Sequence, residues 1–197
     1  ELTARIEEEG LFAEGEVILS AGGSAFFDLV AKRFAEAGLD RCLRPVVRSG
    51  CYLTHDSSMY REEFERVVER TPEAAELGEG LRPALEVWAY VQSLPEPGRA
   101  ILTAGKRDVS FDYGLPEPER WYRSGEHDGP RELGEGYAVV ALNDQHAYLD
   151  VPGDTPLRVG DMVALGISHP CATFDRWQLL PLVNADYDVV GAVRTFF

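Results

Sequence analysis

Two patterns of apolar and polar positions divide the chain, and the first third carries the pattern of βα units. Residues 16–19 and 43–47 are short apolar runs that predict strands. Between them, residues 25–37 place apolar side chains at helical spacing, which predicts a helix that ends at Gly38. A second, more polar helix is expected over residues 59–69.

Beyond residue 80 the pattern changes to short apolar runs separated by turn residues, which predict strands almost to the end of the chain. A linker rich in glycine and glutamate at residues 76–80 marks the change. The polar, turn-rich residues 116–136 predict a long loop. The expected strands are residues 85–92, 100–103, 138–142, 147–151, 162–167, 178–183 and 189–196. Several short strands at close spacing predict an antiparallel barrel or sandwich.

The two βα units are difficult to reconcile with a complete domain. A parallel sheet needs helices on both of its faces, and two units are too few to provide them. We therefore interpret the first third as the end of a larger α/β domain, unless the units pack onto the β domain in a less regular way. Together the two patterns predict an α+β protein, with residues 1–75 in the first part and residues 76–197 in the second.

Composition and charge narrow the classes of function. The 197 residues, 45% hydrophobic and 27% charged, suffice for one medium domain or two small ones. A net charge of −15 repels phosphate backbones and anionic lipids, so neither nucleic acid nor a membrane is expected as a partner. No apolar run approaches the roughly 20 residues that span a bilayer, and the N-terminus lacks the features of a signal peptide. Three cysteines are too few for a disulfide framework, which predicts a cytoplasmic protein.

A glycine-rich turn follows the first predicted strand. Gly22 and Gly23 let backbone N–H groups approach an anion closely, and Ser24 can donate a hydroxyl and cap the helix that follows. The N-terminus of that helix favours negative charge, so the motif suits a phosphate group. The alternative is an ordinary strand-to-helix turn with a serine cap, and the motif alone does not decide between them.

A second loop of small residues, which contains Gly50 and Cys51, follows the second predicted strand. Sites in α/β folds lie at the carboxyl ends of strands, so the amides of these two residues are candidates for a second phosphate contact. Arg48 is placed either to face a ligand nitrogen or to form a structural salt bridge. His55 adjoins Asp56, but neighbouring residues on a strand point to opposite faces, so we interpret His55 as a structural or surface residue.

The sharpest local feature is His169-Pro170-Cys171. On an extended chain, residues two apart face the same way, so His169 and Cys171 are expected to converge on one ion. An imidazole and a thiolate together suit Zn²⁺, and two protein ligands leave coordination positions for water or substrate. The alternative is a buried thiol beside a hydrogen-bonded histidine. The polar clusters at residues 105–108 and 144–146 either line a cleft or form turns.

Taken in order along the chain, these motifs resemble one known family. The series resembles the C-terminal half of the D-serine dehydratase and D-threonine aldolase family of pyridoxal-phosphate enzymes, and in particular its bacterial amino acid deaminases. The resemblance runs through nearly all of the chain, and the ordered set is far more specific than any one motif. The segments that carry it are Leu19-Ser-Ala-Gly-Gly-Ser24, Arg48-Ser-Gly-Cys-Tyr-Leu-Thr-His-Asp56, Gly105-Lys-Arg-Asp108, Asp112-Tyr-Gly-Leu-Pro116, Asn143-Asp-Gln-His146, Ile167-Ser-His-Pro-Cys171 and Thr173-Phe-Asp175.

The resemblance implies an alanine-racemase-like fold, in which a (β/α)8 barrel precedes a C-terminal β domain. On this interpretation residues 1–75 are the last βα units of the barrel and residues 76–197 are the β domain. His169 and Cys171 would be the metal ligands. The implied cofactors are pyridoxal 5'-phosphate and Zn²⁺ or another divalent metal, the implied ligand is a small amino acid, and a homodimer is expected.

The resemblance also implies a set of residues around the cofactor. Ser24, Gly23 and the amides around Gly50 and Cys51 would hold its phosphate. Arg48 occupies the place where alanine racemases put an arginine that faces the pyridine nitrogen. All five residues follow the first two predicted strands.

One residue that the family requires has no counterpart here. The Schiff-base lysine of the family lies near the start of the barrel, before the region that this chain resembles. Lys32 lies on a predicted helix and Lys106 in the predicted β domain, and neither matches it. The isolated chain is therefore expected to lack the catalytic lysine, and any activity would belong to the full-length enzyme.

The resemblance implies a deaminase that eliminates the hydroxyl of a β-hydroxy D-amino acid, such as D-serine, and yields a 2-oxo acid and ammonia. The competing activity within the family is that of a D-threonine aldolase. Aldolases of the family tend to have aspartate where this chain has Cys171, which favours the dehydratase. An alternative of another class is a non-catalytic β module that binds a metal or a small ligand.

Overall fold

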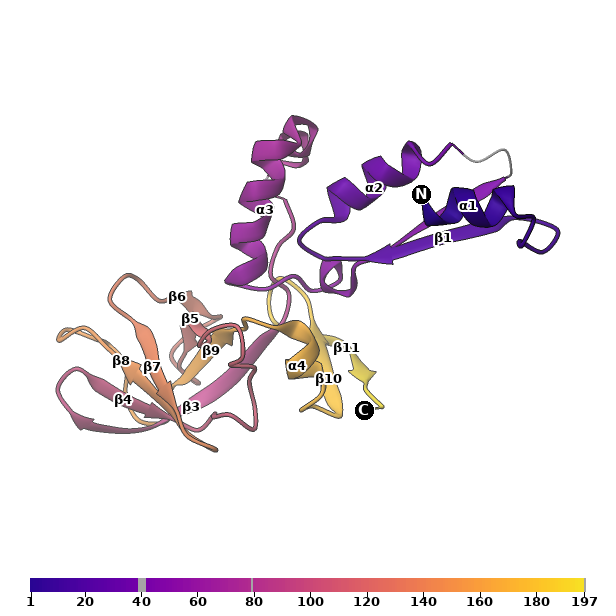
Figure 1. Ribbon diagram of the computed structural model, residues 1–197. Coiled ribbons are helices and arrows are strands. Elements are labelled where there is room, and N and C mark those ends of the chain that lie inside the picture. The colour runs from indigo at the N-terminus through magenta and orange to yellow at the C-terminus, as the bar shows by residue number, and fades with distance from the viewer. Residues whose placement is uncertain (39–41, 79, 197) are drawn as a thin grey trace. The chain divides into compact units, whose positions relative to one another are not determined.

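The chain divides into two compact units, one of helices and a strand pair and one built on a larger sheet (Figure 1). The computed structural model describes residues 1–38, 42–78 and 80–196. The first unit contains Glu1–Leu53 and Glu63–Gly80, and the second contains Thr54–Glu62 and Leu81–Phe197.

The first unit is built around two parallel strands, β1 (Val17–Gly22) and β2 (Leu43–Arg48). Their register places Gly22 opposite Arg48, so both strands end at the same level. The loops that follow them therefore begin side by side, as they do where α/β folds build their sites. The helical elements of this part of the chain are α1 (Leu2–Glu8), α2 (Phe27–Ala35), the 3-10 turn η1 (Gly50–Tyr52), α3 (Met59–Arg70) and the 3-10 turn η2 (Pro72–Leu77). The first residues of α3, up to Glu62, belong to the second unit.

An ion pair ties α2 to the end of α3. The Arg70 guanidinium donates to both carboxylate oxygens of Asp28, at 2.7 and 2.8 Å, and the Thr71 hydroxyl donates to one of them at 2.9 Å. The hydrogen bonds from Arg70 in particular lower the pKa of Asp28 to about 2. The carboxylate therefore stays ionised at neutral pH, and the charge-assisted bonds persist.

The second unit contains seven strands in its main sheet: β3 (Glu86–Glu96), β4 (Arg99–Leu102), β5 (Glu117–Tyr122), β6 (Arg131–Glu132), β7 (Ala138–Leu142), β8 (Ala147–Asp150) and β9 (Met162–Gly166). All neighbours are antiparallel, in the order β6-β5-β9-β3-β4-β8-β7. Register shifts within β3, β5 and β7 allow the sheet to curl (Figure 1). The antiparallel β architecture expected beyond residue 80 is confirmed.

The hydrophobic core of this unit comes from one side of each central strand. Buried and partly exposed side chains alternate along β4 and β8, as period-two burial requires. The buried members include Val91, Leu102, Leu149, Val163 and Leu165. The apolar runs therefore predict these strands because each run supplies the buried face of a strand.

The chain ends in α4 (Pro170–Phe174) and a hairpin of β10 (Leu179–Val183) and β11 (Val189–Arg194). Polar contacts hold the turn of this hairpin on the main sheet. The Tyr187 hydroxyl donates to the Glu86 carboxylate at 3.0 Å, and the Arg120 guanidinium donates to the same carboxylate. The Tyr187 ring also packs edge-to-face on Trp88, with 5.7 Å between the ring centroids.

The expectation of a long loop over residues 116–136 is wrong, because β5 and β6 lie within it. Both strands contain charged side chains, so the pattern of apolar positions did not predict them. Arg120 donates to Glu132 at 2.9 Å between β5 and β6, and Trp121 supplies a buried apolar anchor. Cross-strand ion pairing and backbone pairing with β9 thus take the place of an alternating apolar face.

The pattern of apolar positions also did not predict the short helices. The regular helices α1 and α4 have seven and five residues, too few turns to show helical periodicity. The expected helix cap by Ser24 is wrong. Ala25 and Phe26 lie between Ser24 and the first residue of α2, and Phe26 is the N-cap residue. Within the described ranges, no helix has both the length and the apolar character needed to cross a membrane.

Candidate functional site

Two segments of the second unit that are distant in sequence lie side by side, the loop between β4 and β5 and the segment that leads into α4. The Ser168 hydroxyl donates to the Gly114 carbonyl at 2.9 Å, and the His169 amide donates to the Ser110 hydroxyl at 3.1 Å. Ser110 and Ser168 are both buried. These bonds fix the backbone of His169 on the β4–β5 loop.

A carboxylate holds the imidazole of His169. Its Nδ1 lies 2.6 Å from Asp112 Oδ2, and its ring packs against Tyr113 with 4.8 Å between the ring centroids. Partial burial raises the pKa of Asp112, but the hydrogen bond and charge of His169 outweigh it, so this pKa lies below its ordinary value. An ionised Asp112 accepts the Nδ1–H and leaves the Nε2 lone pair available for a ligand, as carboxylates do when they hydrogen-bond to a metal-binding histidine.

The structure corrects the backbone argument for Cys171. His169 is extended, with φ −152° and ψ 98°, but it is the N-cap residue of α4, and Cys171 is the second residue of that helix. Pro170 promotes the helix because its fixed φ suits the first helical position. The rule that residues two apart face the same way holds for strands, so it does not place Cys171 beside His169. The Cys171 side chain is exposed.

The donor chemistry of His169 and Cys171 nevertheless fits a metal ion. An imidazole and a thiol form a donor set that suits Zn²⁺. No group of three or more His, Cys, Asp or Glu side chains within residues 1–38, 42–78 and 80–196 has the arrangement of a metal site. An ion at His169 and Cys171 would thus have two ligands from this part of the chain, and its remaining positions would go to water, substrate or other groups.

Replacement of Asp112 by asparagine is expected to weaken zinc binding by about 10- to 100-fold. The amide can still contact Nδ1, but it no longer supplies the charge that orients the imidazole and raises its basicity. Competition with a zinc chelator measures the dissociation constant. The exposed Asp154, in the turn before β9, provides the control variant Asp154→Asn. Equal zinc affinity in the two variants would contradict the role of Asp112.

The candidate phosphate-binding residues lie in the first unit, at the carboxyl ends of β1 and β2. Gly23, which precedes Ser24, has φ 128°, a conformation that L side chains rarely adopt. A Cβ on Gly22 would lie 3.2 Å from the Arg48 carbonyl oxygen, and the position of a Cβ on Gly50 is open space. The glycines therefore let the two strands approach closely and leave room for a group at their ends.

Arg48 and Cys51 are held by contacts within the first unit. The Arg48 Nε–H donates to the Ser20 hydroxyl at 2.9 Å. Among the described residues it forms none of the ion pairs, so the salt bridge that was one expectation is not seen there. Cys51 is buried in η1, and the neighbouring Tyr52 ring packs edge-to-face on Phe27 of α2, with 4.7 Å between centroids. The backbone bonding of η1 starts at the Tyr52 amide, so the two amides before it have no intrahelical acceptor and suit an anion.

The candidate residues thus form two sets. The parallel register of β1 and β2 brings the loops of the first set to one sheet edge. The second set lies in the other unit, on and before α4. The contact between Asp112 and His169 adds Asp112 to the second set. The sequence did not predict this contact, because the two residues lie 57 positions apart. The first set is Gly23, Ser24, Arg48, Gly50 and Cys51, and the second is His169 and Cys171.

His55 and Asp56 are buried and structural. Asp56 Oδ1 accepts the amides of Ser58 and Tyr60, at 3.0 and 2.8 Å, where α3 begins. Burial raises the pKa of Asp56 and lowers the pKa of His55. His55 has φ 52° and belongs to no strand, and its Nδ1 lies 3.1 Å from the Asp56 carbonyl oxygen. Asp56 thus serves the start of α3, and His55 contacts the backbone beside it.

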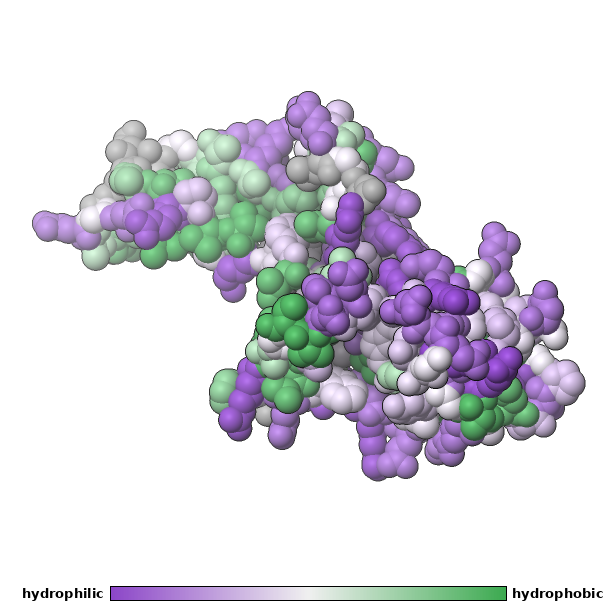
Figure 2. All heavy atoms as spheres, turned by 180° about the vertical axis from the view of Figure 1, so that it is seen from behind, coloured by the Kyte–Doolittle hydropathy of each residue, from purple (hydrophilic) through white to green (hydrophobic). Residues whose placement is uncertain are grey.

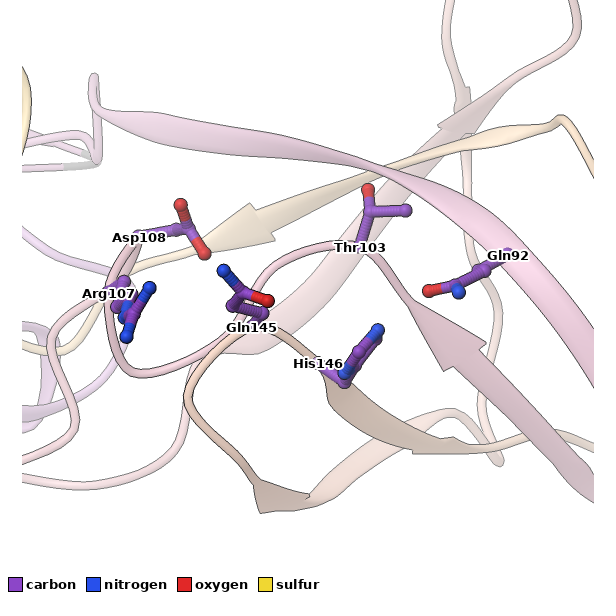
Figure 3. Close-up of a pocket in the computed structure, with 6 residues that line it drawn as sticks. All are labelled: Gln92, Thr103, Arg107, Asp108, Gln145 and His146. Carbon is purple, nitrogen blue, oxygen red and sulfur yellow. The ribbon is translucent and has the colours of Figure 1, made fainter.

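The two polar clusters of the second unit both form turns and line a pocket. The Lys106 amide donates to the Asn143 carbonyl at 2.9 Å, and the Arg107 amide donates to the Asp144 carbonyl at 3.1 Å. Figure 3 shows the pocket, which has a volume of about 550 Å³. Its lining residues are Gln92, Thr103, Arg107, Asp108, Gln145 and His146.

The sequence matches the family model of a serine dehydratase domain over residues 84–183, more than half of the chain. The match covers the loop with Asp112, the segment with His169 and Cys171, and the polar pocket. No curated protein matches the sequence.

Several solved structures share the fold. D-threonine aldolase from Filomicrobium marinum is 21% identical with a TM-score of 0.61, over 92% of this chain and 40% of that one. A metal-free cysteine-to-alanine variant of D-threo-3-hydroxyaspartate dehydratase is 19% identical with a TM-score of 0.57, over 98% and 47%. An alanine-racemase-like protein from Idiomarina loihiensis is 16% identical with a TM-score of 0.58, over 97% and 46%. The chain spans less than half the length of each.

Proposed function

Because this chain belongs to the serine dehydratase domain family, we propose that it is the C-terminal part of a pyridoxal-phosphate- and metal-dependent amino acid deaminase. The proposed reaction is β-elimination from a β-hydroxy D-amino acid such as D-serine, which yields a 2-oxo acid and ammonia. The names of two proteins that share the fold, a D-threonine aldolase and a D-threo-3-hydroxyaspartate dehydratase, support a lyase that acts on a D-amino acid with a β-hydroxyl.

The observation that carries the proposal is the 2.6 Å pair of His169 Nδ1 and Asp112 Oδ2. The ionised carboxylate favours the tautomer with the proton on Nδ1 and orients the ring. The lone pair of Nε2 is then available to bind a metal ion. Cys171 follows on α4 and adds a thiol to the donor set. When bound, the metal would supply a Lewis acid for the substrate hydroxyl, and pyridoxal phosphate an electron sink for the α-carbon.

The residues at the ends of β1 and β2 are proposed to bind the cofactor. The hydroxyl of Ser24 and the amides around Gly23, Gly50 and Cys51 would donate hydrogen bonds to its phosphate. The Arg48 guanidinium would face the pyridine nitrogen, and its partner among the described residues is the uncharged hydroxyl of Ser20. The open space at Gly50 and the positive φ of Gly23 support this placement.

The proton transfers are assigned to a lysine outside this chain. Lys32 lies in α2, and the Lys106 ammonium lies 5.6 Å from the centre of the Phe111 ring. The family's Schiff-base lysine would come from a barrel whose last βα units are residues 1–75.

Exposed apolar side chains on the strand pair support such a barrel. Ile18, Val46 and Val47 are exposed, as side chains are where the neighbouring strands and helices of a larger sheet would cover them. Figure 2 shows hydrophobic surface on this unit.

Product analysis tests the proposed reaction. The full-length protein, supplied with pyridoxal phosphate and Zn²⁺, is expected to release pyruvate and ammonia from D-serine, and 2-oxobutanoate and ammonia from D-threonine. L-serine serves as the control substrate. An aldolase would instead release glycine and acetaldehyde from D-threonine, and that result, or no reaction with either D-amino acid, would contradict the proposal.

A further inference from the structure

The polar pocket of the second unit has a composition that none of the assigned roles explains. Gln92 comes from β3, Thr103 follows β4, Arg107 and Asp108 come from the β4–β5 loop, and Gln145 and His146 come from the turn between β7 and β8. Figure 3 shows these side chains around one space, with those of the loop and the turn facing each other. Each of the six described residues that line it has a polar side chain. Such a lining suits a polar ligand.

Arg107 supplies a positive charge that forms no ion pair within the described part of the chain. The chain has 34 acidic residues and 19 basic ones, and most of its arginines form ion pairs. Across the part of the chain that the structure describes, the Arg107 guanidinium has neither an ion pair nor a hydrogen bond. Its five N–H donors therefore remain for a ligand.

The other polar groups of the pocket favour a bound group that carries a single negative charge, such as one carboxylate. Asp108 Oδ2 accepts the Gly105 amide at 2.8 Å, which uses one carboxylate oxygen within the loop. The negative charge of Asp108 still opposes a doubly charged group, such as a phosphate dianion, beside Arg107. Thr103 Oγ1 accepts the Tyr90 amide at 2.9 Å, so its hydroxyl hydrogen is directed elsewhere. The amides of Gln92 and Gln145 add donors that carry no charge.

The pocket is also rigidly framed. A Cβ on Gly105 would lie 2.4 Å from the Asn143 carbonyl oxygen and 2.6 Å from the amide nitrogens of Gln145 and His146. The loop and the turn therefore pack backbone against backbone, and two amide-to-carbonyl bonds lock them together. The backbone positions from which these side chains extend are therefore fixed relative to one another before a ligand arrives, which reduces the entropic cost of binding.

We propose that this pocket is a binding subsite for a carboxylate group, with Arg107 as its charged anchor and the glutamine amides as neutral donors. A guanidinium binds a carboxylate through two parallel hydrogen bonds. Phosphate is disfavoured because the pocket offers one arginine, no cluster of backbone amides and a neighbouring carboxylate. The carboxylate belongs either to the side chain of an acidic substrate or to a separate small acid that binds as an effector.

The proposal stands apart from the lyase reaction, because binding can be measured without turnover. Isothermal titration calorimetry of the full-length protein with sodium succinate, at constant ionic strength, is expected to show saturable binding. Arg107→Ala should weaken succinate binding by about 10-fold or more, the effect of losing a charge-assisted pair of bonds. Sodium phosphate at equal ionic strength should bind at least about 10-fold more weakly than succinate.

Lys106→Ala is the matched control, because Lys106 is the adjacent cation, does not line the pocket and packs over Phe111. It should change succinate affinity by no more than about twofold. The proposal is overturned if succinate shows no saturable binding, if the two variants weaken it equally, or if phosphate binds as tightly.

Kinetics then separate the two sources of the carboxylate. If it belongs to the substrate, Arg107→Ala raises KM for a 3-hydroxyaspartate by about 10-fold or more and leaves KM for D-serine unchanged. If it belongs to an effector, succinate binds without competing with D-serine. Each result supports the subsite, and neither is needed for the calorimetric test, so a failure of the proposed lyase activity would leave that test intact.

Discussion

Full-length protein that carries Cys171→Ala is expected to lose most of its bound zinc and at least about 100-fold of its rate of ammonia release from D-serine. Cys171 is one of the two ligands proposed from this chain, so its loss leaves His169 as the remaining ligand from this chain. The side chain is exposed on a five-residue helix, so its truncation opens no cavity in the core. Elemental analysis gives the zinc content, and a coupled ammonia assay gives the rate.

Cys42→Ala is the matched control for this prediction. Cys42 is also an exposed cysteine, but it lies just before β2 in the first unit and belongs to neither proposed set of site residues. The control should retain its zinc and its rate. Unchanged zinc in Cys171→Ala, or an equal loss of zinc in both variants, would contradict the metal assignment.

The second large effect is expected on the stability of the second unit. Gly105→Ala places a Cβ 2.4 Å from a carbonyl oxygen and 2.6 Å from two amide nitrogens, and all three atoms belong to the backbone of the turn between β7 and β8. Backbone atoms cannot rotate away, so the turn and the β4–β5 loop must separate. The free energy of unfolding of this unit should fall by about 3 kcal/mol or more.

Gly134→Ala provides the comparison, because a Cβ at Gly134 meets no atom within 4 Å. Its stability should stay the same or rise by up to about 1 kcal/mol, through the lower entropy of the unfolded chain. Hydrogen exchange in peptides from β7 and β8 reports local opening of this unit within the full-length protein. Similar protection in the two variants would show that the close packing around Gly105 is wrong.

Most strands of the second unit were predictable because their apolar runs coincide with the buried face of the sheet. β7 has the predicted bounds, β8 and β9 each end one residue before their predicted ends, and β4 begins and ends one residue earlier than predicted. β5 was not predictable in this way, because its charged side chains are stabilised by partners such as Glu132 on the adjacent strand. A hydrophobic pattern contains no information on such partners, which are set by the sheet order.

The candidate site was predictable to a similar extent. His169 stands out by its residue type and its neighbours, but its carboxylate partner does not, since only the β4–β5 loop brings Asp112 to it. The pairing of the clusters around Arg107 and Gln145 also depends on that loop. Their spacing along the chain could not decide whether they line a cleft or form turns. The helical position of Cys171 was missed because a strand geometry was assumed for a segment in which Pro170 starts a helix.

Anomalous diffraction at the zinc edge, from crystals of the full-length protein grown with pyridoxal phosphate, would locate the metal ion. We expect one ion bonded to His169 Nε2 and Cys171 Sγ, with Asp112 still hydrogen-bonded to His169 Nδ1, and the cofactor phosphate against the loops after β1 and β2. A zinc ion bound elsewhere, or a His169 Nε2 that bonds to a protein group in a zinc-saturated crystal, would contradict this expectation.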